Sequence, residues 1–244
     1  MSLLKSLTTD TSIAQERDSV GNSGPLDSGL HLCTIALAYI TKSAGGAIGL
    51  VLHAKNEAAR EIRQTLWMTS GTAKGGKNFY EKDGEKHYLP GFLLANSLAL
   101  LTIGKELSEV DTEIKVVNVY SPDAKAEVPT KVEMVVDLLG KEILIGLIKQ
   151  TVDKTQKNDA GVYVATGETR DENEIDKLFR ARDRKTVTEI RAQAEEAAFV
   201  ATWEAKWAGH VRNKAKGAAV AGVAGAPKVG SPATSTKPKA SLFA

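Results

Sequence analysis

The pattern of hydrophobic and polar positions divides the first part of the chain into short, strand-like segments. Apolar and β-branched stretches at residues 30–41 and 47–55, separated by a glycine turn, are typical of buried strands. Residues 60–69 alternate polar with apolar side chains, which predicts a third strand with one exposed face. Arg63 and Trp67 belong to the face that we expect to meet solvent or a ligand.

A second group of elements begins with an apolar run at residues 92–104. The run lacks β-branched residues until Thr102 and stops at Gly104, so it predicts a short buried helix. Three strands, a helix and then further strands is the chain order of an oligonucleotide-binding (OB) barrel, although other small barrels share it. We therefore expect a mainly β fold with α additions, namely an OB-fold-like five-stranded barrel with an inserted helix. The further strands are predicted at residues 114–120, 131–136, 141–152 and 162–166.

The segment at residues 186–210 predicts a C-terminal amphipathic helix. Thr186 and Glu189 have the spacing of a capping box, and apolar residues then recur at helical spacing. Trp203 and Trp207 are one turn apart, so we interpret them as packing residues.

The two ends of the chain differ in composition from the domain predicted at residues 26–180. Residues 1–25 are rich in Ser, Thr, Asp and Gly and predict a flexible leader. Residues 211–244 are rich in Gly, Ala, Pro, Ser and Lys and contain no acidic residue, which predicts a disordered basic tail. The tail ends near Leu242 and Phe243, an apolar tip that suits a pocket on a partner protein, although an inert tail has the same composition.

A segment at residues 69–88, here called the basic–aromatic ribbon, combines cations and rings on a glycine-rich backbone. Cations neutralise phosphates, and flat rings stack on unpaired bases whatever their identity. The ribbon therefore predicts a site for single-stranded nucleic acid, whereas the alternative is a solvated hairpin with a few anchoring rings. Its cations are Lys74, Lys77, Lys82 and Lys86, and its rings are Phe79, Tyr80, His87 and Tyr88.

Composition limits the classes of function. The net charge is only +2, so a nucleic-acid site must be a local patch. Cys33 is the only cysteine, which excludes an intramolecular disulfide and fits a reducing compartment. The first residues lack the apolar core of a signal peptide, and no apolar run reaches membrane-spanning length, so we expect a cytoplasmic protein without a membrane partner.

Motifs of enzyme chemistry are weak. Residues 71–77 have the glycine and lysine spacing of a P-loop, but Asn78 follows where Ser or Thr should hold magnesium. The acidic residues at 168–176 lack the pattern of a calcium loop and are followed by basic residues, which indicates a solvated charged surface. We expect no enzymatic activity, no catalytic residue, no metal and no cofactor.

Several phrases of the sequence resemble a family of single-stranded DNA-binding proteins encoded by tailed bacteriophages. They include residues 67–78, 88–92, 117–120, 127–130, 137–141, 157–161 and 166–170, and the resemblance extends over about residues 25–180. It implies protection of single-stranded DNA during phage DNA replication and recombination, in the host cytoplasm. It also implies contacts with phage or host replication, recombination or transcription proteins. Many single-stranded DNA-binding proteins end in an acidic tail, whereas this tail is basic.

The function predicted from the sequence is therefore sequence-nonspecific binding of single-stranded DNA. One alternative is an adaptor that recruits a host or phage polymerase through Leu242 and Phe243, and another is a nucleotide-using enzyme built on residues 71–77. The sequence leaves open whether the protein forms a homo-oligomer. The residues expected to contact DNA are Arg63, Trp67, Lys74, Lys77, Phe79, Tyr80, Lys82, Lys86 and Tyr88.

Overall fold

The computed structural model describes residues 24–121, 124–159 and 162–216 and shows a mainly β protein with few helices. Of the described residues, 24–151 and 171–213 form one compact unit. Residues 152–159, 162–170 and 214–216 form a second unit. The predicted leader lies almost wholly outside the described residues, as do most of the basic tail and its tip at Leu242 and Phe243.

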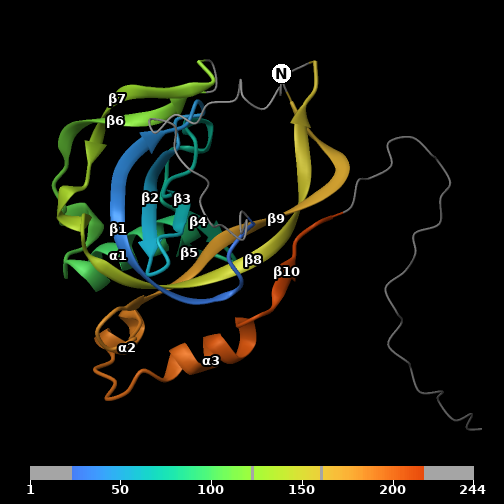
Figure 1. Ribbon diagram of the computed structural model, residues 1–244. Helices are drawn as coiled ribbons and strands as arrows, with labels where there is room; N and C mark the ends of the chain where they lie inside the picture. The colour runs from blue at the N-terminus through green and yellow to red at the C-terminus, as the bar shows by residue number, and fades with distance from the viewer. Residues whose placement is uncertain (1–23, 122–123, 160–161, 217–244) are drawn as a thin grey trace, which may run out of the picture. The chain divides into compact units, whose positions relative to one another are not determined.

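The main sheet is organised around one long strand, β1 (Gly29–Lys42), which arches through the fold (Figure 1). One edge of β1 pairs antiparallel with β2 (Ile48–Asn56), which pairs in turn with β3 (Glu61–Trp67). The other edge is shared, because its first half pairs with β8 (Glu142–Lys157) and Tyr39 and Ile40 pair with β7 (Ala126–Met134). The register of β1 against β2 shifts between Ile35 and Leu37. In the same region, the opposite edge of β1 changes its partner from β8 to β7.

The remaining strands extend this sheet. β6 (Glu113–Ser121) pairs with β7, β9 (Tyr163–Arg180) pairs with β8, and β10 (Val211–Asn213) runs parallel to β8. Within the described residues the sheet has 8 strands and ends at β3, so its backbone ladder is open there. A side chain links this edge to β9, because the Ile175 N–H donates to Gln64 Oε1 at 2.7 Å. A separate hairpin, β4 (Phe79–Lys82) and β5 (Glu85–Tyr88), forms the second sheet.

Helix α1 (Pro90–Thr102) covers the buried face of β1, β2 and β3, as the apolar run predicts. It begins at a proline, whose missing N–H is tolerated in a first helical turn, and it ends before Gly104, which has a left-handed φ of 72°. Leu98 and Leu101 belong to the same core cluster as Leu50 and Leu66 of the sheet. Cys33 is also in this cluster, and burial raises the pKa of its thiol to about 12, so it packs as a structural residue.

The later strands are longer than predicted. β7 begins at Ala126 rather than near residue 131, and β8 and β9 extend well beyond residues 152 and 166. The acidic segment that we interpreted as solvated surface is part of β9, and Ile175, Leu178 and Phe179 on it are buried. The charged residues of β9 lie outside the core and dominate its sequence around the acidic segment. For this reason the short apolar stretch that anchors the strand was not recognised from the sequence.

The prediction of one continuous C-terminal helix was wrong, because residues 186–210 form α2 (Val187–Arg191) and α3 (Ala198–Trp207). The capping box of Thr186 and Glu189 is confirmed. Gln193 then takes a left-handed φ of 52°, and the Ala194 N–H donates to the Glu189 carbonyl, an arrangement that ends helices. The Glu189 carboxylate also accepts from the Phe199 N–H in the first turn of α3, so one side chain serves both helices.

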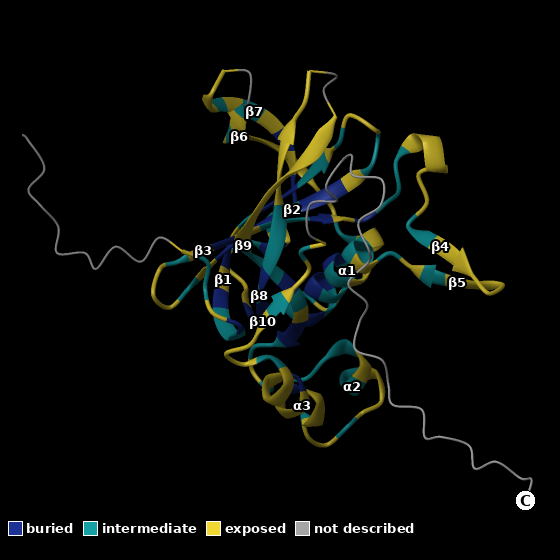
Figure 2. Ribbon diagram, turned by 90° about the vertical axis from the view of Figure 1, so that its right-hand side faces the viewer, coloured by how far each residue is buried: buried dark blue, intermediate teal, exposed yellow. Residues whose placement is uncertain are grey.

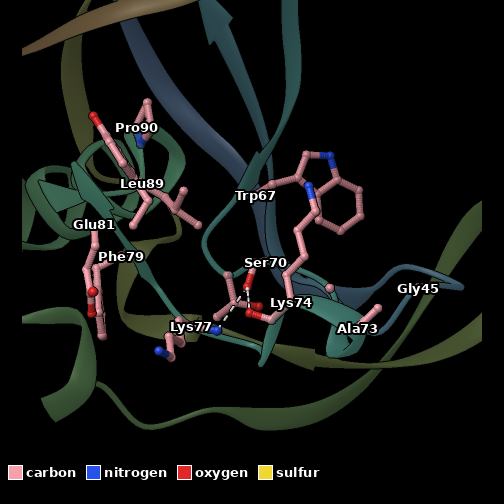
Figure 3. Close-up of a pocket in the computed structure, with 13 residues that line it drawn as sticks. Gly45, Trp67, Ser70, Ala73, Lys74, Lys77, Phe79, Glu81, Leu89 and Pro90 are labelled. Carbon is pink, nitrogen blue, oxygen red and sulfur yellow. Dashed lines mark hydrogen bonds between the residues drawn. The ribbon is translucent and has the colours of Figure 1, made fainter. Parts of the chain in front are cut away.

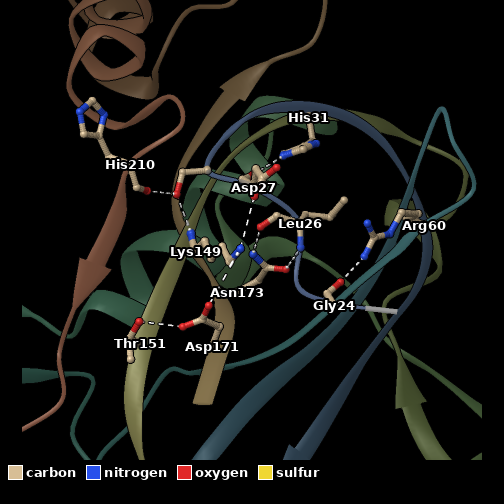
Figure 4. A network of polar contacts seen from close by, with 11 residues as sticks. Gly24, Leu26, Asp27, His31, Arg60, Lys149, Thr151, Asp171, Asn173 and His210 are labelled. Atoms are coloured by element: carbon tan, nitrogen blue, oxygen red, sulfur yellow. Dashed lines mark hydrogen bonds and ion pairs between the residues drawn. The ribbon is translucent and has the colours of Figure 1, made fainter. Parts of the chain in front are cut away.

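A network of polar contacts holds the first described residues against the middle of β8 and β9 and against the residue before β10 (Figure 4). The Leu26 N–H donates to Asn173 Oδ1, and Asn173 Nδ2 donates back to the Leu26 carbonyl, both at 2.8 Å. Ser28 Oγ accepts from the Lys149 N–H and donates to the His210 carbonyl. The start of β1 is therefore tied to β8, β9 and the segment before β10.

The hairpin of the second unit contains a small set of contacts of its own. Lys154 Nζ lies 2.8 Å from Glu168 Oε2, and this ion pair lowers the pKa of the Glu168 carboxyl. The Lys157 ammonium lies 5.4 Å from the centroid of the Tyr163 ring. Across the described residues, no helix combines the length and the hydropathy that a membrane crossing requires.

Candidate nucleic-acid interface

The basic–aromatic ribbon and the end of β3 enclose a cleft of about 820 Å³, here called the ribbon cleft (Figure 3). Trp67 and Lys74 lie on one side of it, and Phe79 with Leu89 and Pro90 lies on the other. The cleft brings together five of the nine predicted DNA contacts, namely Trp67, Lys74, Lys77, Phe79 and Tyr80.

Trp67 is positioned by the alternation of β3. Ile62 and Leu66 point into the core as predicted, which places Trp67 on the opposite face with 43% of its surface exposed. The indole lies over Gly49 of β2, where a Cβ would come within 2.9 Å of the ring. Behind it, a Cβ at Gly91 would come within 2.1 Å of the Trp67 carbonyl oxygen, so α1 begins in close contact with the Trp67 backbone. These contacts fix the ring at the mouth of the cleft.

The loop between β3 and β4 is held by backbone contacts. The Thr72 N–H donates to the Gly45 carbonyl in the β1–β2 turn at 2.8 Å. The Ser70 N–H donates to the Lys77 carbonyl at 2.8 Å, and Ser70 Oγ accepts from the Lys77 N–H at 3.0 Å (Figure 3). The loop is therefore shaped before any ligand arrives, while the Lys74 and Lys77 side chains stay exposed.

The β4–β5 hairpin stands at one side of the sheet, and most of its residues are exposed (Figure 2). The ammonium groups of Lys77 and Lys86 lie 5.4 and 5.1 Å from the Phe79 ring centroid. The Tyr80 ring lies 5.5 Å from that of His87 and retains 46% of its exposure. Phe79 with its two cations and Tyr80 with His87 lie on opposite faces of the hairpin, because successive strand residues alternate. The hairpin thus offers both the rings and the cations that contact with bases and phosphates requires.

Four predicted contacts lie outside the ribbon cleft. Arg63 shares the face of Trp67, but its guanidinium donates to His53 Nε2 at 3.3 Å and lies 3.7 Å from Glu61. Burial and the charge of Arg63 together lower the pKa of His53. Tyr88 packs on Phe92 at 4.9 Å, so part of its surface serves the fold. Lys82 and Lys86 are exposed on the hairpin without lining the cleft.

Four residues that contribute to the ribbon cleft were not predicted from the sequence. Ser70 shapes the loop, Leu89 and Pro90 form an apolar wall, and Glu81 adds one negative charge to the lining. Leu89 is placed by its N–H, which donates to the Asn78 carbonyl at the base of the hairpin. Two sequence features could have indicated the loop and the apolar wall: the Thr-Ser-Gly segment before the lysines and the Leu-Pro pair before the helix.

The structure agrees with the sequence argument against a P-loop. Residues 71–77 contain only the short turn η2 (Thr72–Lys74), and Lys77 leads into strand β4. A P-loop must open a helix so that its amides point at phosphate. Among the described residues, no group of three or more His, Cys, Asp or Glu side chains is arranged to hold a metal ion.

Comparison with known proteins gives no family assignment. No protein-family model matches the chain, and no curated protein matches its sequence. The resemblance to the phage DNA-binding family therefore stays a prediction, and the functional argument depends on the geometry of the ribbon cleft.

Proposed function

We propose that this protein binds single-stranded DNA without sequence preference and that the ribbon cleft is the central contact. The observation that carries the proposal is the convergence of Trp67, Phe79 and Tyr80 with Lys74 and Lys77 on one cleft. Rings stack on any base, and each stacked base contributes on the order of 1–3 kcal/mol. The two lysines would neutralise phosphates on the same strand.

The arrangement favours a single strand over a duplex. In a duplex the base faces are covered by their neighbours, so only an unpaired strand can offer them to Trp67 and Tyr80. Both rings are nearly half exposed, and Trp67 is fixed by close backbone contacts, so little order needs to be created on binding. Three ring faces beside two ammonium groups fit stacking and charge neutralisation better than the reading of base edges.

We further propose that the main unit is an OB-like barrel. The elements β1, β2, β3, α1, β8 and β9 follow the chain order of an OB barrel, which has three strands, a helix and two strands. In addition, β1 pairs with both β2 and β8. The Ile175–Gln64 contact brings β9 back to the open edge of β3. In this interpretation the β4–β5 and β6–β7 hairpins are additions.

The biological role proposed with this activity is protection of single-stranded DNA during phage replication and recombination in the host cytoplasm, without catalysis. It is supported by the sequence resemblance together with the ribbon cleft. Contacts with phage or host replication, recombination or transcription proteins through Leu242 and Phe243 belong to the same proposal. That tip lies outside the described residues.

Removing both cleft lysines tests the electrostatic half of the proposal. A Lys74→Ala/Lys77→Ala variant should bind oligo-dT more weakly, with the slope of log affinity against log salt reduced by about 1.4, since each single-strand phosphate contact contributes about 0.7. Fluorescence anisotropy across a salt series measures both quantities. The matched control is Lys55→Ala/Lys131→Ala, which removes two exposed lysines outside the cleft and should leave the slope unchanged. Equal slopes for both variants would reject the cleft as the phosphate site.

A further inference from the structure

Among the described residues, strand β6 is an edge strand of the main sheet. It is 9 residues long, and within the described residues it pairs only with β7. Its outer edge therefore presents a row of backbone N–H and C=O groups that can pair with another strand. Natural edge strands are usually short, or carry proline and several charges, to prevent such pairing. β6 has no proline, and its single lysine is Lys115.

The face of β6 that points away from the core carries an apolar row. Val117 and Val119 face inward and pack in the cluster of Tyr39, Val132 and Met134. On the opposite face, Ile114, Val116 and Tyr120 are 65%, 62% and 57% exposed. These three side chains are here called the β6 row.

Polar residues border the β6 row on its inner side. In the β6–β7 register, Glu133 lies opposite Ile114, Lys131 opposite Val116 and Glu127 opposite Tyr120. The apolar strip therefore lies at the outermost edge of the sheet, with a charged rim toward the rest of the molecule. A hydrophobic centre with a polar rim is the usual anatomy of a protein interface.

The charges of β6 point to the kind of partner. Its only ionic side chains are Glu113 and Lys115, and their carboxylate and ammonium groups pair at 2.6 Å. The edge is therefore neutral, so it offers no selectivity for an acidic or a basic partner and does not repel a strand of its own sequence. A neutral apolar edge strand is complementary to itself when it runs antiparallel.

We infer that β6 pairs antiparallel with β6 of a second copy of this chain, which joins the two main sheets across a two-fold axis. With the axis at Val117, Ile114 of each copy faces the partner's Tyr120, and Val116 faces the partner's Asn118. Each β-branched–aromatic pair occurs twice, and the backbone ladder runs the length of the strand. None of the β6 row lines the ribbon cleft, so the dimer and the DNA contact are separable.

The solution mass of the DNA-free protein tests this inference. Light scattering and sedimentation equilibrium should show a concentration-dependent dimer of the 26.0 kDa chain. Val116→Lys places two like charges near the two-fold axis and should shift the protein to monomer at the same concentration. Because Val116 is exposed, the variant should retain the wild-type circular dichroism spectrum and melting curve, and its affinity for a short oligo-dT should be unchanged.

Leu93→Lys is the matched control, because Leu93 on α1 is comparably exposed but lies away from the sheet edge. It should remain dimeric. A wild-type protein that is monomeric at all concentrations would overturn the inference, and so would a dimer that survives Val116→Lys. A monomeric Val116→Lys variant that binds oligo-dT normally would support the inferred dimer. The effect of the cleft variants on DNA binding tests the proposed function and not the dimer.

Discussion

Replacing Trp203 with alanine is expected to lower the free energy of unfolding by about 3–5 kcal/mol, the range for removing a buried aromatic side chain. Trp203 is only 3% exposed, and its indole lies on β8 over Gly146, where a Cβ would approach the ring within 2.9 Å. The Phe179 ring meets it edge-on at 6.2 Å. Its Nε1 donates to Asp176 Oδ2 at 2.8 Å, so the truncation also leaves a carboxylate without this partner.

Urea unfolding followed by circular dichroism measures this loss. Trp207→Ala is the matched control, because the same residue type one turn later is only partly buried and packs at the margin of the cluster. It should cost clearly less than Trp203→Ala. If the two substitutions had the same small effect, α3 would not be docked on β8 through Trp203 as the structure shows.

The second large effect concerns affinity. A Trp67→Ala/Tyr80→Ala variant should lose about 2–6 kcal/mol of binding free energy toward oligo-dT, which is about 30-fold or more in the dissociation constant, because each stacked base contributes about 1–3 kcal/mol. Both rings are solvent-accessible at the cleft, so the fold should remain intact. Fluorescence anisotropy measures the affinity, and urea unfolding checks the stability.

Phe199→Ala supplies the control for ring removal. Phe199 is an exposed ring on α3 with a lysine ammonium, that of Lys177, 5.6 Å from its centroid, so it reproduces the ring–cation pairing away from the ribbon cleft. Its removal should leave DNA affinity unchanged. A double variant that binds as tightly as the wild type would show that neither ring stacks on bases.

The first three strands and α1 could be predicted from the sequence because their periodicity is local. Alternation places Ile62 and Leu66 inside and Trp67 outside without reference to any other part of the chain. β9 could not be predicted in full, since its first half is exposed without a periodic apolar pattern and only Ile175, Leu178 and Phe179 near its end are buried. The break between α2 and α3 was also hidden, because Ala, Gln and Glu favour helices and the contact that stabilises the break joins Glu189 to Phe199.

The candidate site could also be predicted only in part. Composition alone drew attention to Lys74, Lys77, Phe79 and Tyr80, since their types and spacing suit a nucleic acid. Their convergence with Trp67 depends on the contact of Thr72 with the Gly45 turn and on the start of α1 against β3, and neither contact leaves a periodic signal. The sequence pattern could not show that Arg63 lies outside the cleft, because Arg63 shares a strand face with Trp67. In the structure its guanidinium contacts His53 and Glu61 instead.

The most direct test of the account is the affinity of the full chain for labelled oligo-dT and for duplex DNA of the same length, measured by fluorescence anisotropy across a salt series. We expect tight, salt-sensitive binding to the single strand and much weaker binding to the duplex, because only unpaired bases can stack on Trp67, Phe79 and Tyr80. Equal binding to both forms, or weak binding that does not respond to salt, would contradict it.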